Sequence, residues 1–149
     1  MSDEVFADRI RMSAILYVDD EPTIRRAVHY WLDRRGHTVH SARSVSGAKR
    51  CMKIHRFDGI FIDVWLGDGS GLDLFSWLRE HEPRLADETV FVTGDLLMKA
   101  ETRQRVIDTG RPVLEKPFDL RDLDVYVQKW DTRRPRPAEQ GFGAQAEAV

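Results

Sequence analysis

The stretch FDGIFIDVWLGDGSGLDLF, residues 57–75, contains the features that decide the fold. A three-residue apolar run, Ile60 to Ile62, ends in the carboxylate of Asp63. So short a run between turn residues predicts a strand that is buried on both faces. A glycine-rich loop follows, and residues 72–80 have the apolar spacing of a helix. This arrangement is a common way to build a site in α/β proteins, although Asp63 could equally do no more than end the strand.

Four other short apolar runs have the same form, and a helical pattern separates each from the next. They predict strands at residues 14–18, 38–42, 89–92 and 113–114. The run at 38–42 is less apolar than the first, so we expect it near an edge of the sheet. Strands that alternate with helices five times predict an open, mostly parallel, doubly wound α/β sheet with helices on both faces.

Apolar spacing within the helical segments predicts which side chains face the core. The first helix begins at Pro22, which suits the first turn of a helix, and Ser44 is expected to cap the second. The inward-facing residues that this spacing predicts are Ile24, Ala27, Val28, Trp31 and Leu32, then Val45, Ala48, Cys51 and Met52, then Leu74, Phe75 and Leu78, then Leu97, Ala100 and Ile107, and finally Leu120, Leu123, Val127 and Trp130.

The composition restricts the classes of function. Hydrophobic residues make up 42% of the chain and charged residues 32%, which is typical of a globular protein. A net charge of -2 gives no general attraction to nucleic acid, so we expect no nucleic-acid binding. The single Cys51 excludes an internal disulfide and favours a reducing compartment. No apolar run approaches the roughly 20 residues that a membrane span needs, so a cytoplasmic protein with no membrane association is expected.

The ends of the chain differ in composition from its middle. Residues 1–12 are mostly polar and are expected to form a flexible leader. Residues 131–149 are rich in proline, alanine and glycine, and they carry too few apolar side chains to order themselves. We therefore predict one folded domain over residues 13–130, followed by a disordered tail.

Polar side chains stand at the ends of four of the five predicted strands: Asp19 with Asp20, Asp63, Thr93 and Lys116. In an open parallel sheet, ligands bind beyond these carboxyl ends. Three carboxylates at one place repel each other unless a hard cation such as Mg²⁺ lies among them. A carboxylate can also attack phosphorus, and the transferred phosphoryl group needs electropositive or donor groups around its oxygens. A threonine hydroxyl and a lysine ammonium are groups of that kind.

The motifs YVDDEP, FIDVWLGDGSG, VTG and LEKPF together resemble the receiver domains of two-component response regulators. The resemblance covers roughly residues 13–130 and implies a flavodoxin-like (βα)5 fold with strand order 2-1-3-4-5. It implies that Asp63 is the phosphoacceptor. It also implies that Asp19, Asp20 and Asp63 hold Mg²⁺ together with the backbone carbonyl of Trp65.

The resemblance gives Thr93 and Lys116 contacts to the phosphoryl oxygens. It also gives Lys116–Pro117 a cis peptide bond that turns the lysine into the site. Two positions depart from the family pattern. Gly67 stands where proline is commonest, which should loosen the loop. Val113 stands where the family usually has a switching tyrosine or phenylalanine, so the inward swing of an aromatic ring cannot operate here as it is usually described.

As a receiver domain, the protein would be a phosphorylation-controlled switch rather than an enzyme with turnover. Its expected partners are a sensor histidine kinase or a histidine phosphotransfer protein, an unidentified downstream protein and, after phosphorylation, a second copy in a dimer. The chain would be a stand-alone receiver or the last domain of a hybrid histidine kinase. Two alternatives remain: a Mg²⁺-dependent phosphatase of the haloacid-dehalogenase type, and a receiver-like docking module that is never phosphorylated. Against the first, that family has D-x-D on one strand, whereas Asp19 and Asp20 are adjacent.

Overall fold

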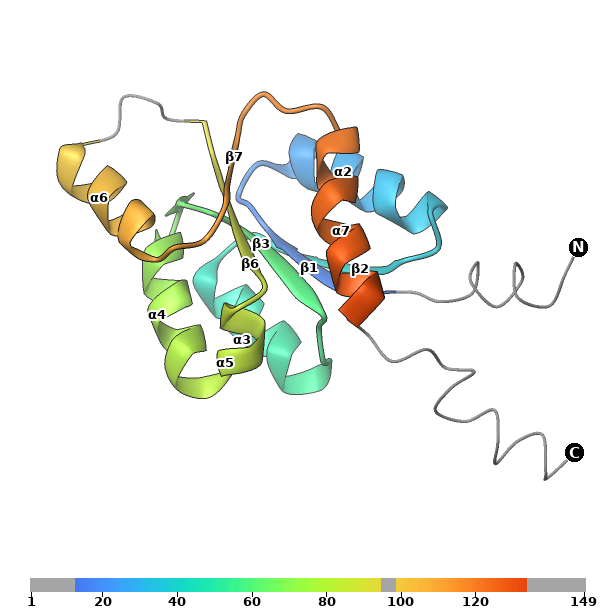
Figure 1. Cartoon of the computed structure of the whole chain (residues 1–149), viewed down its shortest axis with the longest axis horizontal. Coiled ribbons are helices and arrows are strands. Elements are labelled where there is room, and N and C mark those ends of the chain that lie inside the picture. Colours follow the sequence, from blue (N-terminus) through green and yellow to red (C-terminus); the bar gives the residue numbers. More distant parts are fainter. Residues whose placement is uncertain (1–12, 95–98, 134–149) are drawn as a thin grey trace, which may run out of the picture.

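The computed structural model of the chain describes residues 13–94 and 99–133, which form a central sheet between two layers of helices (Figure 1). Five parallel strands build the sheet in the order β2-β1-β3-β6-β7. Their bounds are Ala14–Val18 for β1, Thr38–Ala42 for β2, Gly59–Asp63 for β3, Thr89–Thr93 for β6 and Val113–Glu115 for β7. The predicted doubly wound sheet is confirmed, and the less apolar strand β2 lies at its edge.

Within residues 13–94 and 99–133, six helices connect or follow the strands. They are α2 (Pro22–Arg34), α3 (Val45–Ile54), α4 (Gly71–His81), α5 (Pro83–Ala86), α6 (Ala100–Asp108) and α7 (Arg121–Arg133). The predicted cap of α3 is present, because Ser44 Oγ accepts a hydrogen bond of 3.0 Å from the backbone N–H of Gly47. Helix α4 begins with a capping box, in which Ser70 and Asp73 exchange hydrogen bonds between side chain and backbone.

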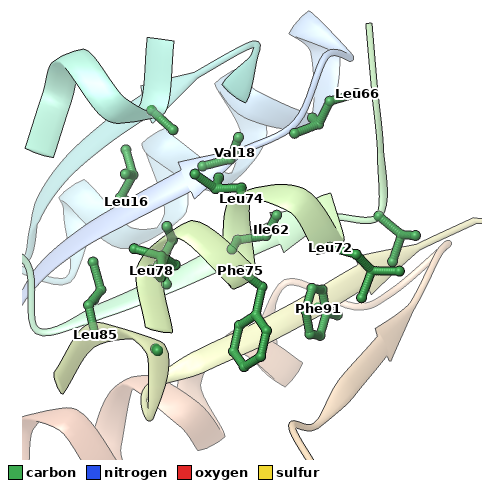
Figure 2. Close-up of a cluster of buried hydrophobic side chains, with 14 of the residues drawn as sticks. Leu16, Val18, Ile62, Leu66, Leu72, Leu74, Phe75, Leu78, Leu85 and Phe91 are labelled. Carbon is green, nitrogen blue, oxygen red and sulfur yellow. The ribbon is translucent and has the colours of Figure 1, made fainter. Parts of the chain in front are cut away.

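Two hydrophobic clusters lie on opposite faces of the sheet, because successive side chains of a strand point to opposite sides. In Figure 1, α2 and α7 cover one face, and α3, α4, α5 and α6 cover the other. Figure 2 shows the second cluster, in which the rings of Phe75 and Phe91 meet edge to face with centroids 5.4 Å apart. On the opposite face, the ring of Phe61 packs against that of Trp130, with the ring centroids 5.1 Å apart.

Strand β3 is buried along its whole length, as its short apolar run predicts. Close packing explains the glycine at its start. A Cβ atom at Gly59 would stand 2.2 Å from the indole of Trp130, which is itself only 3% exposed. The last helix therefore packs directly on the backbone of the central strand, and β3 cannot move independently of it.

Two of the predicted core-facing patterns need correction: Ala27 of α2 is exposed, and the predicted inward face of the helix after β6 is the wrong one. Leu97 lies outside the described residues, Ala100 is exposed, and Ile107 is 60% exposed. The residue that α6 buries is Val106, which is 4% exposed and belongs to the hydrophobic cluster on that face of the sheet. A helix of nine residues that contacts the core through one side chain has too little periodicity to fix its orientation from sequence.

The predicted boundary at residue 130 lies inside α7, which continues to Arg133. The predicted leader, 1–12, and most of the predicted tail, 134–149, lie outside the described residues. Within the part of the chain that the structure describes, no helix has both the length and the apolar character to cross a membrane.

Candidate functional site

The predicted site residues lie at one edge of the sheet, where the parallel strands end. Strand pairing aligns Asp63 with Val92 and Thr93 with Glu115, so the chain after each strand leaves the sheet at the same place. Lys116 follows at once, and its backbone N–H donates to the Thr93 carbonyl at 2.8 Å. The structure thus brings Asp63, Thr93 and Lys116 to neighbouring strand ends, as the sequence predicts.

The ammonium group of Lys116 lies among three carboxylates. Its Nζ is 2.8 Å from Oδ2 of Asp63, 3.0 Å from Oδ2 of Asp19 and 3.0 Å from Oε1 of Glu21. The peptide bond between Lys116 and Pro117 is cis, as the resemblance implies. A single cation therefore holds together acids from β3 and from the loop after β1.

Burial sets the electrostatics of this cluster. The Asp19 side chain is fully buried and Asp63 is 5% exposed. Desolvation raises the pKa of Asp63 to about 6, although the hydrogen bond from Lys116 acts in the opposite direction. For Lys116, burial favours the neutral amine, but its hydrogen bonds to the three carboxylates outweigh this effect and raise the pKa. Burial thus makes the charged form of the Asp63 carboxylate unfavourable, whereas the neighbouring Lys116 stays charged.

Asp19 is oriented by hydrogen bonds from its own neighbourhood. Oδ2 accepts from the hydroxyl of Tyr17 at 3.0 Å, and Oδ1 accepts from the backbone N–H of Glu21 at 3.0 Å. Burial, followed by the nearby charge of Asp19, raises the pKa of Tyr17, so its hydroxyl remains a donor. Arg25 also donates to the Asp19 carbonyl at 2.7 Å.

Glu21 is the member of the site that sequence reasoning missed. Its carboxylate joins those of Asp19, Asp20 and Asp63 in a group whose oxygens lie within 4.8 Å of one another. The Glu21 side chain is 56% exposed, so it forms the solvent side of the cluster. The sequence signal that could have identified Glu21 is the run of three acids, Asp19 to Glu21, before Pro22. In the turn that starts α2, the backbone N–H of Glu21 donates to Asp19, which brings the two residues together.

Trp65 and Thr93 flank the Asp63 carboxylate in different ways. The backbone N–H of Trp65 donates to Oδ1 of Asp63 at 3.1 Å, while its indole is 44% exposed. Thr93 is 2% exposed and follows Val92, the residue paired with Asp63. The Trp65 carbonyl as a metal ligand and the Thr93 hydroxyl as a phosphoryl contact remain predictions.

A groove of about 490 Å³ lies beside the cluster, between α2 and the connection from β7 to α7. Its walls are largely apolar, and Lys116 and Glu21 of the carboxylate cluster are among the residues that line it. The lining residues are Glu21, Thr23, Ile24, Ala27, Gly94, Lys116, Pro117, Phe118 and Leu120. Another pocket, of about 470 Å³, lies between the end of α3 and α5 and contains none of the predicted site residues.

The donor set fits a small, hard cation. Four carboxylates within 4.8 Å supply only oxygen ligands, which are the ligands that Mg²⁺ prefers. The neighbouring ammonium of Lys116 adds a fixed positive charge that favours an oxyanion at the same place. The arrangement is therefore suited to hold a cation and an anionic group next to Asp63.

Comparison with known proteins identifies a family whose description matches most of the chain. The family described as "Response regulator receiver domain" matches residues 15–128. The response regulator protein PilR of Pseudomonas aeruginosa is 34% identical over 113 residues, which are 75% of this chain and 24% of PilR. The chain thus spans about a quarter of the length of this relative.

Solved receiver domains have the same fold. A CheY-like response regulator receiver domain from Methanospirillum hungatei superposes with a TM-score of 0.72, at 22% identity, over 82% of this chain and 95% of that chain. The beryllofluoride-activated NtrC4 receiver domain dimer superposes with a TM-score of 0.70, at 26% identity, over 82% of this chain and 98% of that chain.

Proposed function

This chain belongs to the response regulator receiver domain family, and on that premise we propose that Asp63 accepts a phosphoryl group that switches the binding of a partner. One observation carries the proposal. The buried carboxylate of Asp63 lies 2.8 Å from the Lys116 ammonium, at the strand ends where the acidic cluster gathers. A nucleophilic carboxylate beside a fixed cation is what transfer of an anionic phosphoryl group requires.

In the proposed reaction, a carboxylate oxygen of Asp63 attacks the phosphorus of a phosphohistidine on the donor protein. The new phosphorus–oxygen bond forms as the phosphorus–nitrogen bond breaks, and the imidazole leaves with the electron pair. Lys116 stabilises the negative charge on the phosphoryl oxygens, and the Thr93 hydroxyl donates to them. The Trp65 N–H, which lies at Oδ1, holds the carboxylate in one orientation.

Mg²⁺ is the proposed cofactor, because receiver domains bind it in an acidic pocket and this chain has such a cluster. Asp19, Asp20 and Asp63 would hold it with the Trp65 carbonyl, and Glu21 lies within reach of the same group. When bound, the ion supplies positive charge that offsets the repulsion between the carboxylates and the phosphoryl oxygens. The buried Asp19, fixed by Tyr17, is a ligand that needs little reorganisation.

The phosphoryl donor is proposed to be a sensor histidine kinase or a histidine phosphotransfer protein. Its docking site would be the largely apolar groove between α2 and the β7–α7 connection, because Glu21 and Lys116 of the site are among the residues that line it. Apolar side chains of the donor would fill the groove and direct the phosphohistidine towards Asp63. We propose that the phospho-form then binds a downstream protein or a second copy of the chain.

The experiment is phosphorylation by acetyl phosphate with Mg²⁺, followed by intact mass spectrometry. The wild type should gain one phosphoryl group, and Asp63→Asn should gain none. Asp33→Asn, which removes an exposed carboxylate on α2, is the matched control and should behave as the wild type. Multiple turnover of p-nitrophenyl phosphate would support the phosphatase alternative, whereas a lack of labelling in every variant would support the unphosphorylated docking module.

A further inference from the structure

The loop after Asp63 contains a small hairpin that the sequence does not predict. Strand β4 (Trp65–Leu66) pairs with β5 (Gly69–Ser70) in antiparallel register, so that Trp65 lies opposite Ser70. This hairpin joins the phosphoacceptor strand to α4, and its first residue donates to Asp63 Oδ1. Anything that holds the hairpin therefore acts on the reacting carboxylate.

The base of the hairpin is fixed by packing and hydrogen bonds. Gly71 N–H donates to the Val64 carbonyl at 2.8 Å, and Ser70 Oγ donates to the same carbonyl at 3.3 Å. A Cβ atom at Gly71 would stand 2.2 Å from the Asp63 carbonyl oxygen, so the start of α4 lies directly on the backbone of β3. These contacts hold the chain where it leaves and re-enters the site.

At the tip of the hairpin, the Asp68 side chain connects the loop to the start of α3. The Asp68 carboxylate accepts hydrogen bonds from the backbone N–H groups of Val45 at 2.8 Å and Ser46 at 3.1 Å, the first two residues of α3. These amides have no partner within the helix. Both bonds lower the pKa of Asp68, so it remains ionised at neutral pH. Next to Asp68, a Cβ atom added at Gly67 would meet no heavy atom within 4 Å beyond the adjacent residues of the chain.

We propose that Asp68 is a positioning residue that clamps the hairpin to α3 and so keeps the Trp65 N–H on the Asp63 carboxylate and the half-exposed Trp65 side chain in its place. Loss of the clamp frees the tip at Gly67, and the two-residue strands β4 and β5 then separate readily. The consequence for the lifetime of the phospho-form rests on the proposed function, whereas the placement of Trp65 does not.

A simpler role for Asp68 would be to stabilise the start of α3. Ser44 separates the two roles, because its Oγ caps the same helix by accepting from Gly47 N–H, and its hydrogen bond of 3.3 Å to Ser46 Oγ also lies at the start of α3 rather than on the hairpin. If Asp68 serves only the helix, Ser44→Ala and Asp68→Ala should have the same effects on Trp65. If Asp68 clamps the hairpin, only Asp68→Ala should disturb Trp65.

The first test is amide hydrogen exchange of Trp65, measured by nuclear magnetic resonance on the unphosphorylated full chain. We expect exchange roughly fivefold or more faster in Asp68→Ala, because the N–H leaves its carboxylate partner. Ser44→Ala should leave the exchange at the wild-type rate. Asp68→Asn should lie between, because its single side-chain oxygen can accept only part of the two bonds. Equal Trp65 exchange in Asp68→Ala and the wild type, or equal acceleration in Ser44→Ala, would overturn the proposal.

The second test is the lifetime of the phospho-form after removal of acetyl phosphate. Asp68→Ala should shorten it roughly threefold, a smaller effect than loss of the indole itself, whereas Ser44→Ala should not shorten it. If the wild type is not labelled at all, the proposed function fails, and the exchange of Trp65 still decides the clamp. If labelling is normal but Asp68→Ala does not speed the exchange of the Trp65 amide, the proposed role of Asp68 is wrong and the proposed function stands. Should Asp68→Ala fail to fold, the same comparison is made with Asp68→Asn.

Discussion

Replacing the phosphoacceptor should make the unliganded protein more stable, not less. In the folded protein, burial raises the pKa of Asp63 from 3.8 to about 6, even with Lys116 beside it. The folded state therefore binds a proton at Asp63 more tightly than the unfolded chain does. Stability falls as the pH rises from the unfolded pKa to the folded pKa, and the full cost is present above it. Asparagine resembles the protonated carboxyl in shape and charge, so Asp63→Asn removes this cost.

The size of the stability change follows from the shift in the pKa of Asp63. Between 3.8 and about 6, at about 1.36 kcal/mol for each pKa unit, the buried charge costs up to about 3 kcal/mol. Lys116 keeps Asp19 and Glu21 as partners in the variant, so the substitution does not leave an isolated buried cation. We expect Asp63→Asn to raise the free energy of unfolding by about 1–3 kcal/mol near neutral pH.

The assay is urea unfolding in the presence of EDTA at several pH values. The stability gap between Asp63→Asn and the wild type should be largest at about pH 7.5 and should close towards about pH 4, where the wild-type carboxyl takes up a proton. Added Mg²⁺ should stabilise the wild type more than the variant and narrow the gap. The control variant Asp33→Asn, at an exposed position, should be as stable as the wild type at every pH. An Asp63→Asn variant that is equally or less stable than the wild type at about pH 7.5 in EDTA would refute the reasoning.

Three further outcomes are expected. Asp20→Ala should weaken the affinity for Mg²⁺, followed by the change in tryptophan fluorescence during a titration, by roughly tenfold or more, about 1.4 kcal/mol. An unchanged titration would place the metal elsewhere. Trp65→Asn should shorten the phospho-form's lifetime roughly tenfold, because a small polar side chain admits water that the indole excludes, and a lifetime at or above that of the wild type would contradict this. Gly59→Ala should destabilise the fold by about 1–3 kcal/mol in thermal unfolding, because the new Cβ would overlap Trp130; an unchanged midpoint would mean that the helix adjusts freely.

The sheet could be predicted from sequence because each strand is a short apolar run that a polar residue ends. The stretch around Ile60–Ile62 predicts β3 to within one residue at either end, and the carboxylate after it predicts the site. Parallel pairing then places Asp63, Thr93 and Lys116 at one edge without any knowledge of their contacts. Local pattern and global topology agree here, which is why the inference succeeds.

What the sequence did not reveal depends on contacts between distant segments. The β4–β5 hairpin has two-residue strands and no apolar alternation, and it is held by Asp68, which reaches amides 23 and 22 residues earlier in the chain. The orientation of α6 differs by one residue from the predicted one, because a single contact through Val106 decides it. Glu21 joins the site through the turn before α2, where its backbone N–H donates to Asp19 Oδ1 and its carboxylate lies 3.0 Å from Lys116 Nζ.

The most direct test of the central claim is to map the phosphorylated residue after transfer from a histidine kinase or histidine phosphotransfer protein. Borohydride reduction of the acyl phosphate marks the modified aspartate, and peptide mass spectrometry identifies it. The claim that Asp63 is the sole acceptor predicts one marked peptide, which contains Asp63 and is absent from the Asp63→Asn variant. Marking of another carboxylate in the wild type, or transfer to Asp63→Asn at the wild-type level, would contradict it.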